Sequence, residues 1–316
     1  MFRQSLSRTI TAVTIIGLFL SACASPATPA PTPTPTQPKP IVLTDGLKRT
    51  ISLPTPAKRV VSMAPSNTEM LFAIGAGSQV VGRDEFSDYP VEAKSLPTVG
   101  GSYGKYNMEA IVNLQPDLVL ATEINTKEQV KTLEDLGLTV YLLPNPTDFD
   151  GMYQYLMTVA QLTGHETQAS SLIERLKTRV KAVQNKILPL SSRPSVFYEL
   201  DSTDPNAPYT SGPGTFVNLI IDMAGGFNIG NKLSSPWAQI SLEELVVQNP
   251  AIILLGDSAY GVSVESVATR TGWSALDAVK NKRVYAFDDN LVSRPGPRLV
   301  DGLEQMAKLI HPEVFQ

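Results

Sequence analysis

The segment RVVSMAPSNTEMLFAIGAGSQVVG, residues 59–82, contains one complete strand–helix unit and decides the fold. The apolar residues 60–63 predict a short strand, because a buried parallel strand reads as a continuous apolar run. Ser66 follows, with Glu69 three residues later, which is the pattern of a helix N-cap with a capping box. Two glycines after the apolar face of this helix indicate its end. The segment therefore predicts a strand followed directly by a helix.

The same layout occurs a second time in SVFYELDSTDPNAPYTSGPGTFVNLIIDMAGGFNIG, residues 195–230. In each copy a proline precedes a glycine by twelve positions, over residues 65–77 and 213–225. The segments NMEAIVNLQPDLVLA and SLEELVVQNPAIILLG also match, since each has a glutamate (Glu109, Glu243) seven residues before a proline. Any βα protein can yield one such match by chance, but two in the same order indicate distant structural repeats.

Strand and helix signals alternate in both halves of the chain, which is typical of α/β lobes with largely parallel sheets. Residues 149–190 lie between the halves and carry the apolar period of two helices. The second helix is expected to have about 23 residues, or a length of roughly 34 Å, enough to run from one lobe to the other. The predicted fold class is α/β, with two lobes joined by one long α-helix.

The N-terminal residues are typical of an exported protein. Residues 1–8 carry two arginines and no acid, and the apolar stretch 10–20 is shorter than the roughly 20 residues of a transmembrane helix. The tetrapeptide LSAC, which ends at Cys23, resembles the lipobox of bacterial lipoproteins, in which the cysteine receives lipid and becomes the new N-terminus. An ordinary signal peptide with a chance cysteine is the alternative. A lipid on Cys23 would anchor the protein to the outer face of the cytoplasmic membrane.

Five parts are predicted along the chain. Alternating proline and threonine or alanine after Cys23 favours extended polyproline II, which acts as a semi-rigid spacer. In order, the parts are a lipoprotein signal peptide (1–23), a tether (24–41), an N-terminal α/β lobe (42–146), connecting helices (147–190) and a C-terminal α/β lobe (191–316).

Charge and composition disfavour several function classes. The formal net charge is −4, and loss of the two arginines of the signal peptide changes it to −6 in the mature chain, which disfavours nucleic acid as a partner. The chain has one cysteine, Cys23, so no disulfide within it is expected once that residue is lipidated. It has two histidines, which leave little for a metal site or a histidine-dependent catalyst.

Two glycine-rich segments come near to catalytic or nucleotide-binding motifs without completing them. VGGSYGKYN has Val99 where a P-loop needs its first glycine and Tyr106 where serine or threonine must follow the lysine. GAGSQVVG has Val80 in place of the third glycine of a dinucleotide-binding motif. The chain is therefore not expected to be an enzyme or to hold a metal or a cofactor.

Six further segments form a specific combination: SMAPSNTEMLFAIGAGSQVVG, EFSDYP, LPTVGG, NMEAIVNLQPDLVLA, SPWAQISLEELVVQNPAIILL and RPGPR. Together they resemble the substrate-binding proteins of ABC importers for cobalamin and iron siderophores, and most of all the cobalamin-binding members. The resemblance runs from about residue 59 to residue 311. It implies a monomeric protein with two α/β lobes joined by one long helix, which grips its ligand in the cleft between the lobes and delivers it to a permease dimer with ATPase subunits.

The same resemblance implies which residues contact the ligand. Phe86 of EFSDYP takes the place of an aromatic beside the corrin, and the other implied contacts are Tyr103, Tyr209, Trp237 and Arg294. The sequence departs from the family pattern in the kind of aromatic at Phe86 and Tyr103, and in Asn290, where an acid is expected. Ordinary core packing is the alternative role for each aromatic.

Cobalamin is the ligand that these residue types favour, as cargo and not as a cofactor. A corrin is a broad, flat, largely apolar ring with amide arms, so aromatic faces can cover it while a few polar groups orient the amides. A negatively charged ferric siderophore favours several arginines or lysines instead, and these loops offer mainly Arg294 and Lys105. Capture of an iron siderophore or haem is the alternative function.

Glu109 and Glu243 occupy the same place in the two repeats, each at the start of a short predicted helix. A carboxylate there is stabilised by the helix dipole, which alone could explain both residues. The resemblance implies a further role, in which one glutamate on each lobe docks onto arginines of the permease. A roughly two-fold-symmetric binding protein can meet a dimeric permease in this way.

Overall fold

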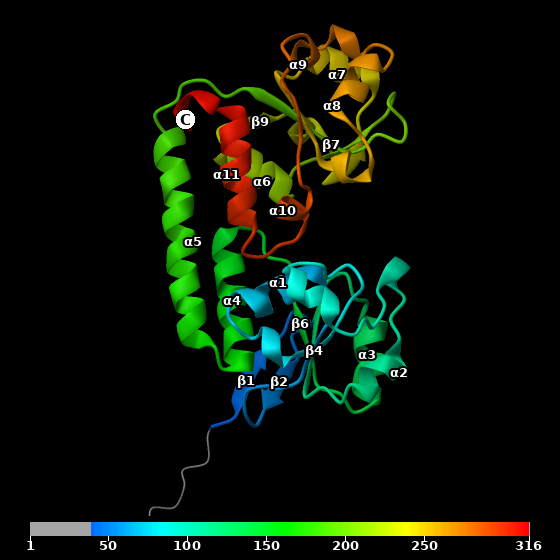
Figure 1. The fold of residues 1–316 in the computed structure, drawn as a ribbon, viewed down its shortest axis with the longest axis vertical. Helices are drawn as coiled ribbons and strands as arrows, with labels where there is room; N and C mark the ends of the chain where they lie inside the picture. The colour runs from blue at the N-terminus through cyan, green and yellow to red at the C-terminus, as the bar shows by residue number, and fades with distance from the viewer. Residues whose placement is uncertain (1–38, 316) are drawn as a thin grey trace, which may run out of the picture. The chain divides into compact units, whose positions relative to one another are not determined.

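A four-stranded parallel sheet forms the centre of the N-terminal lobe (Figure 1). The computed structural model describes residues 39–315, so the signal peptide, Cys23 and the tether through residue 38 lie outside the described residues. The strands follow the order β4 (Val80–Arg83), β3 (Val60–Ser62), β5 (Leu118–Thr122), β6 (Val140–Leu143). A separate antiparallel hairpin precedes them, made of β1 (Ile41–Thr44) and β2 (Thr50–Leu53).

Helices cover both faces of this sheet, because the buried side chains of its strands alternate between two apolar clusters. Val60, Leu118 and Leu120 pack with α1 (Pro65–Ala73) and α4 (Phe149–Thr163). Val61, Val119 and Ala121 pack with α2 (Met108–Asn113) and α3 (Lys127–Asp135). The predicted parallel sheet is confirmed in this lobe.

The C-terminal lobe has a six-stranded mixed sheet. Its main path is β10 (Trp237–Gln239), β8 (Tyr209–Ser211), β7 (Ser195–Asp201), β11 (Ile252–Leu255), β12 (Val284–Ala286), and β9 (Phe227–Asn228) pairs beside β7. Strands β7, β9, β11 and β12 are parallel to one another where they pair, whereas β8 and β10 are antiparallel additions. The seven-residue loop between β7 and β8 explains this difference from the N-terminal lobe, since a parallel return needs a longer crossover.

The two faces of the second sheet are also covered by helices. One face packs on α6 (Phe216–Met223) and α11 (Leu299–Ile310), and the short α10 (Asn290–Ser293) adjoins both helices. The other face packs on α7 (Leu242–Gln248), α8 (Val264–Thr269) and α9 (Asp277–Lys280). Both lobes are therefore α/β layers, as the sequence predicts. Among residues 39–315, no helix has both the length and the apolar character needed to cross a membrane.

The long helix predicted between the lobes is α5 (Glu166–Ile187), with 22 residues (Figure 1). It packs against α4 and then against α11 of the second lobe, where Arg179 pairs with Asp301 (2.5 Å) and Glu304 (2.7 Å). One apolar cluster continues from α1 and α4 through α5 into α6 and α11. The lobes are thus joined by shared core packing as well as by chain connectivity.

The predicted capping box at the start of α1 is wrong. Ala64 is the N-cap residue, Pro65 is the first helical residue, and no side chain caps this end. Ser66 and Glu69 are instead buried within the helix. Glu69 points its carboxylate toward cations that lie far away in the sequence, so long-range pairing overrides the local pattern.

These cations belong to what we call the inter-lobe ion network: Glu69, Asp88, Tyr89, Arg294 and Arg298. Arg298 donates to Glu69 twice, from Nε to Oε2 (2.9 Å) and from Nη2 to Oε1 (2.5 Å). Arg294 Nη1 donates to Asp88 Oδ1 (2.7 Å) and to Glu69 Oε1 (3.3 Å). The guanidinium of Arg298 also lies over the ring of Tyr89, 4.0 Å from its centre. The network ties α1 and the loop after β4 in the first lobe to the C-terminal part of the second lobe.

Burial makes this network costly to break. The side chain of Glu69 is 1% exposed and those of Arg294 and Arg298 are 13% and 12% exposed. Burial of Arg298 opposes its charge, but the hydrogen bonds that it donates to Glu69 prevail and raise the pKa of that guanidinium. Burial likewise opposes ionisation of Asp88, yet the hydrogen bond from Arg294 holds the pKa of that carboxyl below its ordinary value. Both shifts favour the charged forms of Arg298 and Asp88.

We expect Glu69→Ala to lower the free energy of unfolding by about 3–5 kcal/mol, because it leaves two largely buried guanidinium groups without their shared carboxylate. Denaturation in urea measures this change. Asp222→Ala is the control, since it breaks the Arg193–Asp222 pair, whose side chains are 51% and 66% exposed. The control should cost about 0–1 kcal/mol. Equal losses for the two variants would contradict a special role for the network.

Candidate functional site

Two exposed aromatic side chains share one face of the outer strands of the second lobe. Gln239 of β10 pairs with Tyr209 of β8, so Trp237, two residues earlier, is the diagonal neighbour of Tyr209. Diagonal residues on paired strands point to the same face, with Cα atoms about 7–8 Å apart. Trp237 is 53% exposed and Tyr209 is 46% exposed. Core packing is therefore not the role of either ring.

The side chain next to them is also unusual. Ser211 lies directly opposite Trp237, is fully buried, and its hydroxyl has no hydrogen-bond partner among the described residues. Polar groups left unpaired in this way are uncommon in folded proteins. The face that carries Tyr209 and Trp237 thus combines exposed rings with an unused hydrogen-bonding group.

In the first lobe, Phe86 is presented by a loop that follows β4. Asp84 holds this loop, because its carboxylate accepts the backbone N–H of Phe86 (2.9 Å) and the hydroxyl of Ser87. Burial raises the pKa of Asp84, although both hydrogen bonds favour its charged form. Ser87 in turn contacts the hydroxyl of Thr68 on α1 (2.7 Å). Phe86 is 53% exposed at the end of this hydrogen-bonded turn.

Tyr103 lies on a different loop, in the short 3₁₀ helix Ser102–Gly104. A backbone hydrogen bond from Gly101 to Lys105 (2.8 Å) closes this loop. Tyr103 has a φ of 50°, in the left-handed region that non-glycine residues rarely adopt, and its side chain is 98% exposed. Nothing in the described chain covers its ring, which is free to meet a ligand or a partner.

Arg294 differs from the other predicted ligand residues, because the structure places it in the inter-lobe ion network. Arg294 pairs with Asp88, which lies two residues after Phe86 on the same loop. The structure thus brings Arg294 near the Phe86 loop and brings Tyr209 beside Trp237, while Tyr103 lies on a loop of its own. Asn290, where an acid is expected, bonds to the carboxylate of Asp288 (3.0 Å).

Glu109 and Glu243 have matching positions. Each is the second residue of its helix, α2 or α7, and each helix is capped by a side chain, Asn107 or Ser241. The strand that follows each helix, β5 or β11, lies between two parallel neighbours in its sheet. Both glutamates are exposed, and neither forms an ion pair with another described residue. The repeat predicted from the sequence therefore holds at these two sites.

The second lobe has a pocket of about 360 Å³ that the sequence did not predict. It lies at the carboxyl ends of β7 and β11 and is lined by Leu200, Asp201, Ser202, Thr203, Asp257, Tyr260 and Val262. Ligands of α/β sheets bind outside the carboxyl ends of the strands. The polar residues that directly follow the apolar runs of β7 and β11 could therefore have indicated a binding pocket. Their meeting depends on which strands are neighbours, and the sequence does not state this.

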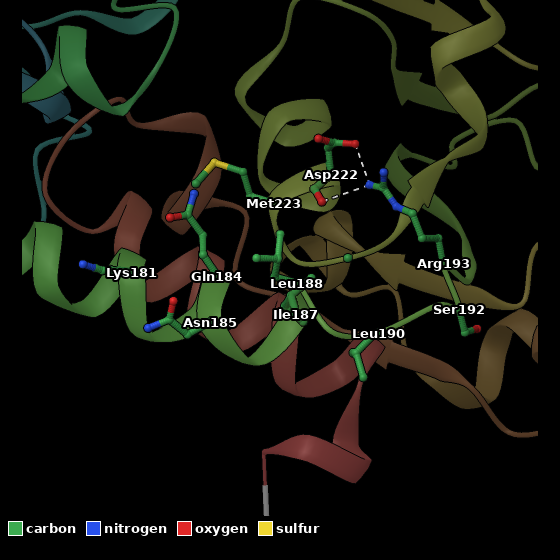
Figure 2. A pocket seen from close by; sticks show the side chains of 11 residues that line it. Lys181, Gln184, Asn185, Ile187, Leu188, Leu190, Ser192, Arg193, Asp222 and Met223 are labelled. Atoms are coloured by element: carbon green, nitrogen blue, oxygen red, sulfur yellow. Dashed lines mark hydrogen bonds and ion pairs between the residues drawn. The ribbon is translucent and has the colours of Figure 1, made fainter.

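A second pocket, of about 670 Å³, lies where α5 and α6 end (Figure 2). Lys181, Gln184 and Met223 line it, and Arg193 donates to Asp222 (2.5 Å) at its side. None of the predicted ligand residues lines this pocket. Among residues 39–315 there is also no group of three or more acidic, histidine or cysteine side chains placed to hold a metal ion.

Comparison with known proteins places the chain in a family. Residues 60–291 match the periplasmic binding protein family. An uncharacterized ABC transporter substrate-binding lipoprotein of Bacillus subtilis is 33% identical over 312 residues, 96% of this chain and 97% of the relative. A cobalamin-binding protein of Halobacterium salinarum is 31% identical over 279 residues, covering 86% of this chain and 74% of the relative.

A solved structure shows the same fold. It is that of a possible iron-binding (periplasmic solute-binding) protein from Staphylococcus epidermidis, with a TM-score of 0.70, 30% identity, and coverage of 81% of this chain and 99% of that one. These proteins bind and transport solutes, which supports the expectation that the chain is not an enzyme. The chain belongs to the periplasmic binding protein family, as a substrate-binding protein of an ABC transporter.

Proposed function

We propose that this protein captures cobalamin, or a related corrinoid, between its two lobes and delivers it to an ABC permease. The observation that carries the proposal is the pair of exposed rings, Tyr209 and Trp237, on one face of β8 and β10. Flat aromatic faces bury the flat apolar surface of a corrin at a low cost in side-chain entropy. Phe86 and Tyr103 supply further exposed rings from two loops of the first lobe.

Charge at the site favours a corrinoid over an anionic ligand. The structural relative described as a possible iron-binding protein makes an iron siderophore, or haem, the second candidate. Such ligands need cations, and Arg294 is already shared between the carboxylates of Glu69 and Asp88. The other main cation of these loops is Lys105, which is exposed and lies two residues after Tyr103. The loops therefore carry little positive charge for an anionic ligand. The neutral amide arms of a corrinoid fit a site with so few free cations better than the carboxylates of an anionic ligand do.

Membrane attachment completes the proposed function. The lipobox-like LSAC ending at Cys23 predicts a lipid anchor, and the Bacillus subtilis relative is described as a lipoprotein. A multiply acylated cysteine holds a protein stably at a membrane, whereas one acyl chain binds only marginally. The protein would then act at the outer face of the cytoplasmic membrane, as a monomer tethered near the permease dimer and its ATPase subunits.

We expect the purified protein to bind hydroxocobalamin, and Trp237→Ala to weaken that binding by about 1.5–4 kcal/mol, as for a buried aromatic anchor. Isothermal titration calorimetry measures both affinities. Phe227→Ala is the matched control, because Phe227 is 42% exposed on the same sheet but pairs with the opposite end of β7. The control should bind normally. Failure of the wild type to bind hydroxocobalamin, with tight binding of a ferric siderophore or haem, would favour the second candidate.

We expect Glu109→Ala combined with Glu243→Ala to leave corrinoid affinity unchanged but to impair uptake and permease-stimulated ATP hydrolysis. Exposed ion pairs contribute only about 0.2–1 kcal/mol each, so the pair steers and orients docking more than it holds the complex. Glu128→Ala with Glu244→Ala removes the same charge from exposed positions on α3 and α7 and should transport normally. Normal transport by the first double variant would remove Glu109 and Glu243 from the mechanism.

A further inference from the structure

The pocket at the carboxyl ends of β7 and β11 contains an unpaired acceptor. Asp257 lines it, is 4% exposed, and accepts the hydroxyl of Ser202 on Oδ2 (2.7 Å). Its other oxygen, Oδ1, is buried and has no hydrogen-bond partner among the described residues. Burying a carboxylate oxygen without a partner is unfavourable, and such a group marks a place where a ligand can supply the missing donor.

Nearby charges do not satisfy this carboxylate. The cation closest in the hydrogen-bond chain is Arg270, but it is used by Glu199, with contacts of 2.6 and 3.0 Å. Arg270 reaches the pocket only through Ser202 Oγ (3.0 Å). Burial raises the pKa of Glu199, and the charge of Asp257 acts in the same direction, while Arg270 opposes both. The cluster therefore has more carboxyl groups than cations, Glu199 and Asp257 against the one guanidinium of Arg270.

Asp201 adds to this imbalance at the exposed side of the pocket. One of its oxygens accepts the backbone N–H of Thr203 (2.7 Å), and no lysine or arginine of residues 39–315 pairs with it. The unused groups of the pocket are thus mainly acceptors. They suit a neutral or cationic N–H donor and oppose a carboxylate.

The pocket adjoins the aromatic face. Asp201 on β7 lies directly opposite Tyr209 on β8, and Tyr209 shares its face with Trp237. A flat ring resting on these two aromatics would extend its side arms toward the end of β7. The pocket, of about 360 Å³, has room for such an arm.

We propose that this pocket is a subsite for a carboxamide arm of the ligand, with Asp257 and Asp201 accepting the amide N–H groups. The proposal rests on the corrinoid function proposed above and adds a reason for its selectivity. Corrinoid arms that end in amides gain hydrogen bonds here, whereas the carboxylate arms of haem or of a hydrolysed corrin meet unpaired negative charge. Asp257 is thereby a specificity-determining residue.

Two corrin probes test this subsite: cobinamide, whose arms are amides, and cobyrinic acid, whose arms are carboxylates. We expect the wild type to bind cobinamide at least about 10-fold more tightly, the discrimination that one lost buried hydrogen bond with an unpaired charge can supply. Asp257→Asn should reduce that ratio about 10-fold, because Ser202 would hold the amide oxygen and the new NH₂ would replace the acceptor with a donor. Calorimetric titration with each probe gives the ratio.

Two further variants make the result decisive. Thr203→Lys places a cation at an exposed position of the pocket, where folding is not at risk, and should also shift the preference toward cobyrinic acid. Asp204→Asn removes an equal charge from the same loop outside the pocket and should leave the ratio unchanged. Equal ratios in the wild type, Asp257→Asn and Thr203→Lys would overturn the subsite while corrinoid binding stands. Binding of neither corrin by the wild type would overturn the proposed function itself.

Discussion

The carboxylate of Glu69 joins the two lobes, because it is shared by Arg298 and Arg294 at a point where all three side chains are largely buried. Two buried guanidinium groups and one buried carboxylate are stable only while their hydrogen bonds to one another are kept. The lobes therefore have little freedom to separate at this point. Asp88 completes the balance from the loop that also carries Phe86. The position of one predicted ligand contact thus depends on the same network that fixes the lobes.

A continuous core reinforces this constraint. Helix α5 packs against both lobes, and one apolar cluster extends from α1 to α11. On this scaffold the proposed ligand contacts lie at strand ends and in loops: Phe86 and Tyr103 in the first lobe, and Tyr209, Trp237 and the Asp257 pocket in the second. Loops on a rigid frame are where binding residues are commonly found. We therefore infer that ligand selection lies in these surfaces and not in large lobe movements.

The sequence predicted those features that depend on local pattern. The apolar runs of β3, β5 and β11, the long period of α5, and the matched positions of Glu109 and Glu243 all follow from residues close together in the chain. The sequence did not predict the features that depend on contacts between residues far apart in the chain. Ser66 and Glu69 have the spacing of a capping box, but Glu69 pairs with residues more than 220 positions away. The Asp257 pocket likewise joins residues about 55 positions apart, and strand order alone brings them together.

Small-angle X-ray scattering of the protein with and without hydroxocobalamin tests whether a ligand enters between lobes that are held at a nearly fixed separation. The continuous helix and the inter-lobe ion network predict that the radius of gyration changes by less than about 1 Å, a small fraction of the size of a domain of this length. A decrease larger than this on saturation would show that the lobes close by a wide hinge movement and that neither α5 nor the inter-lobe ion network fixes their separation.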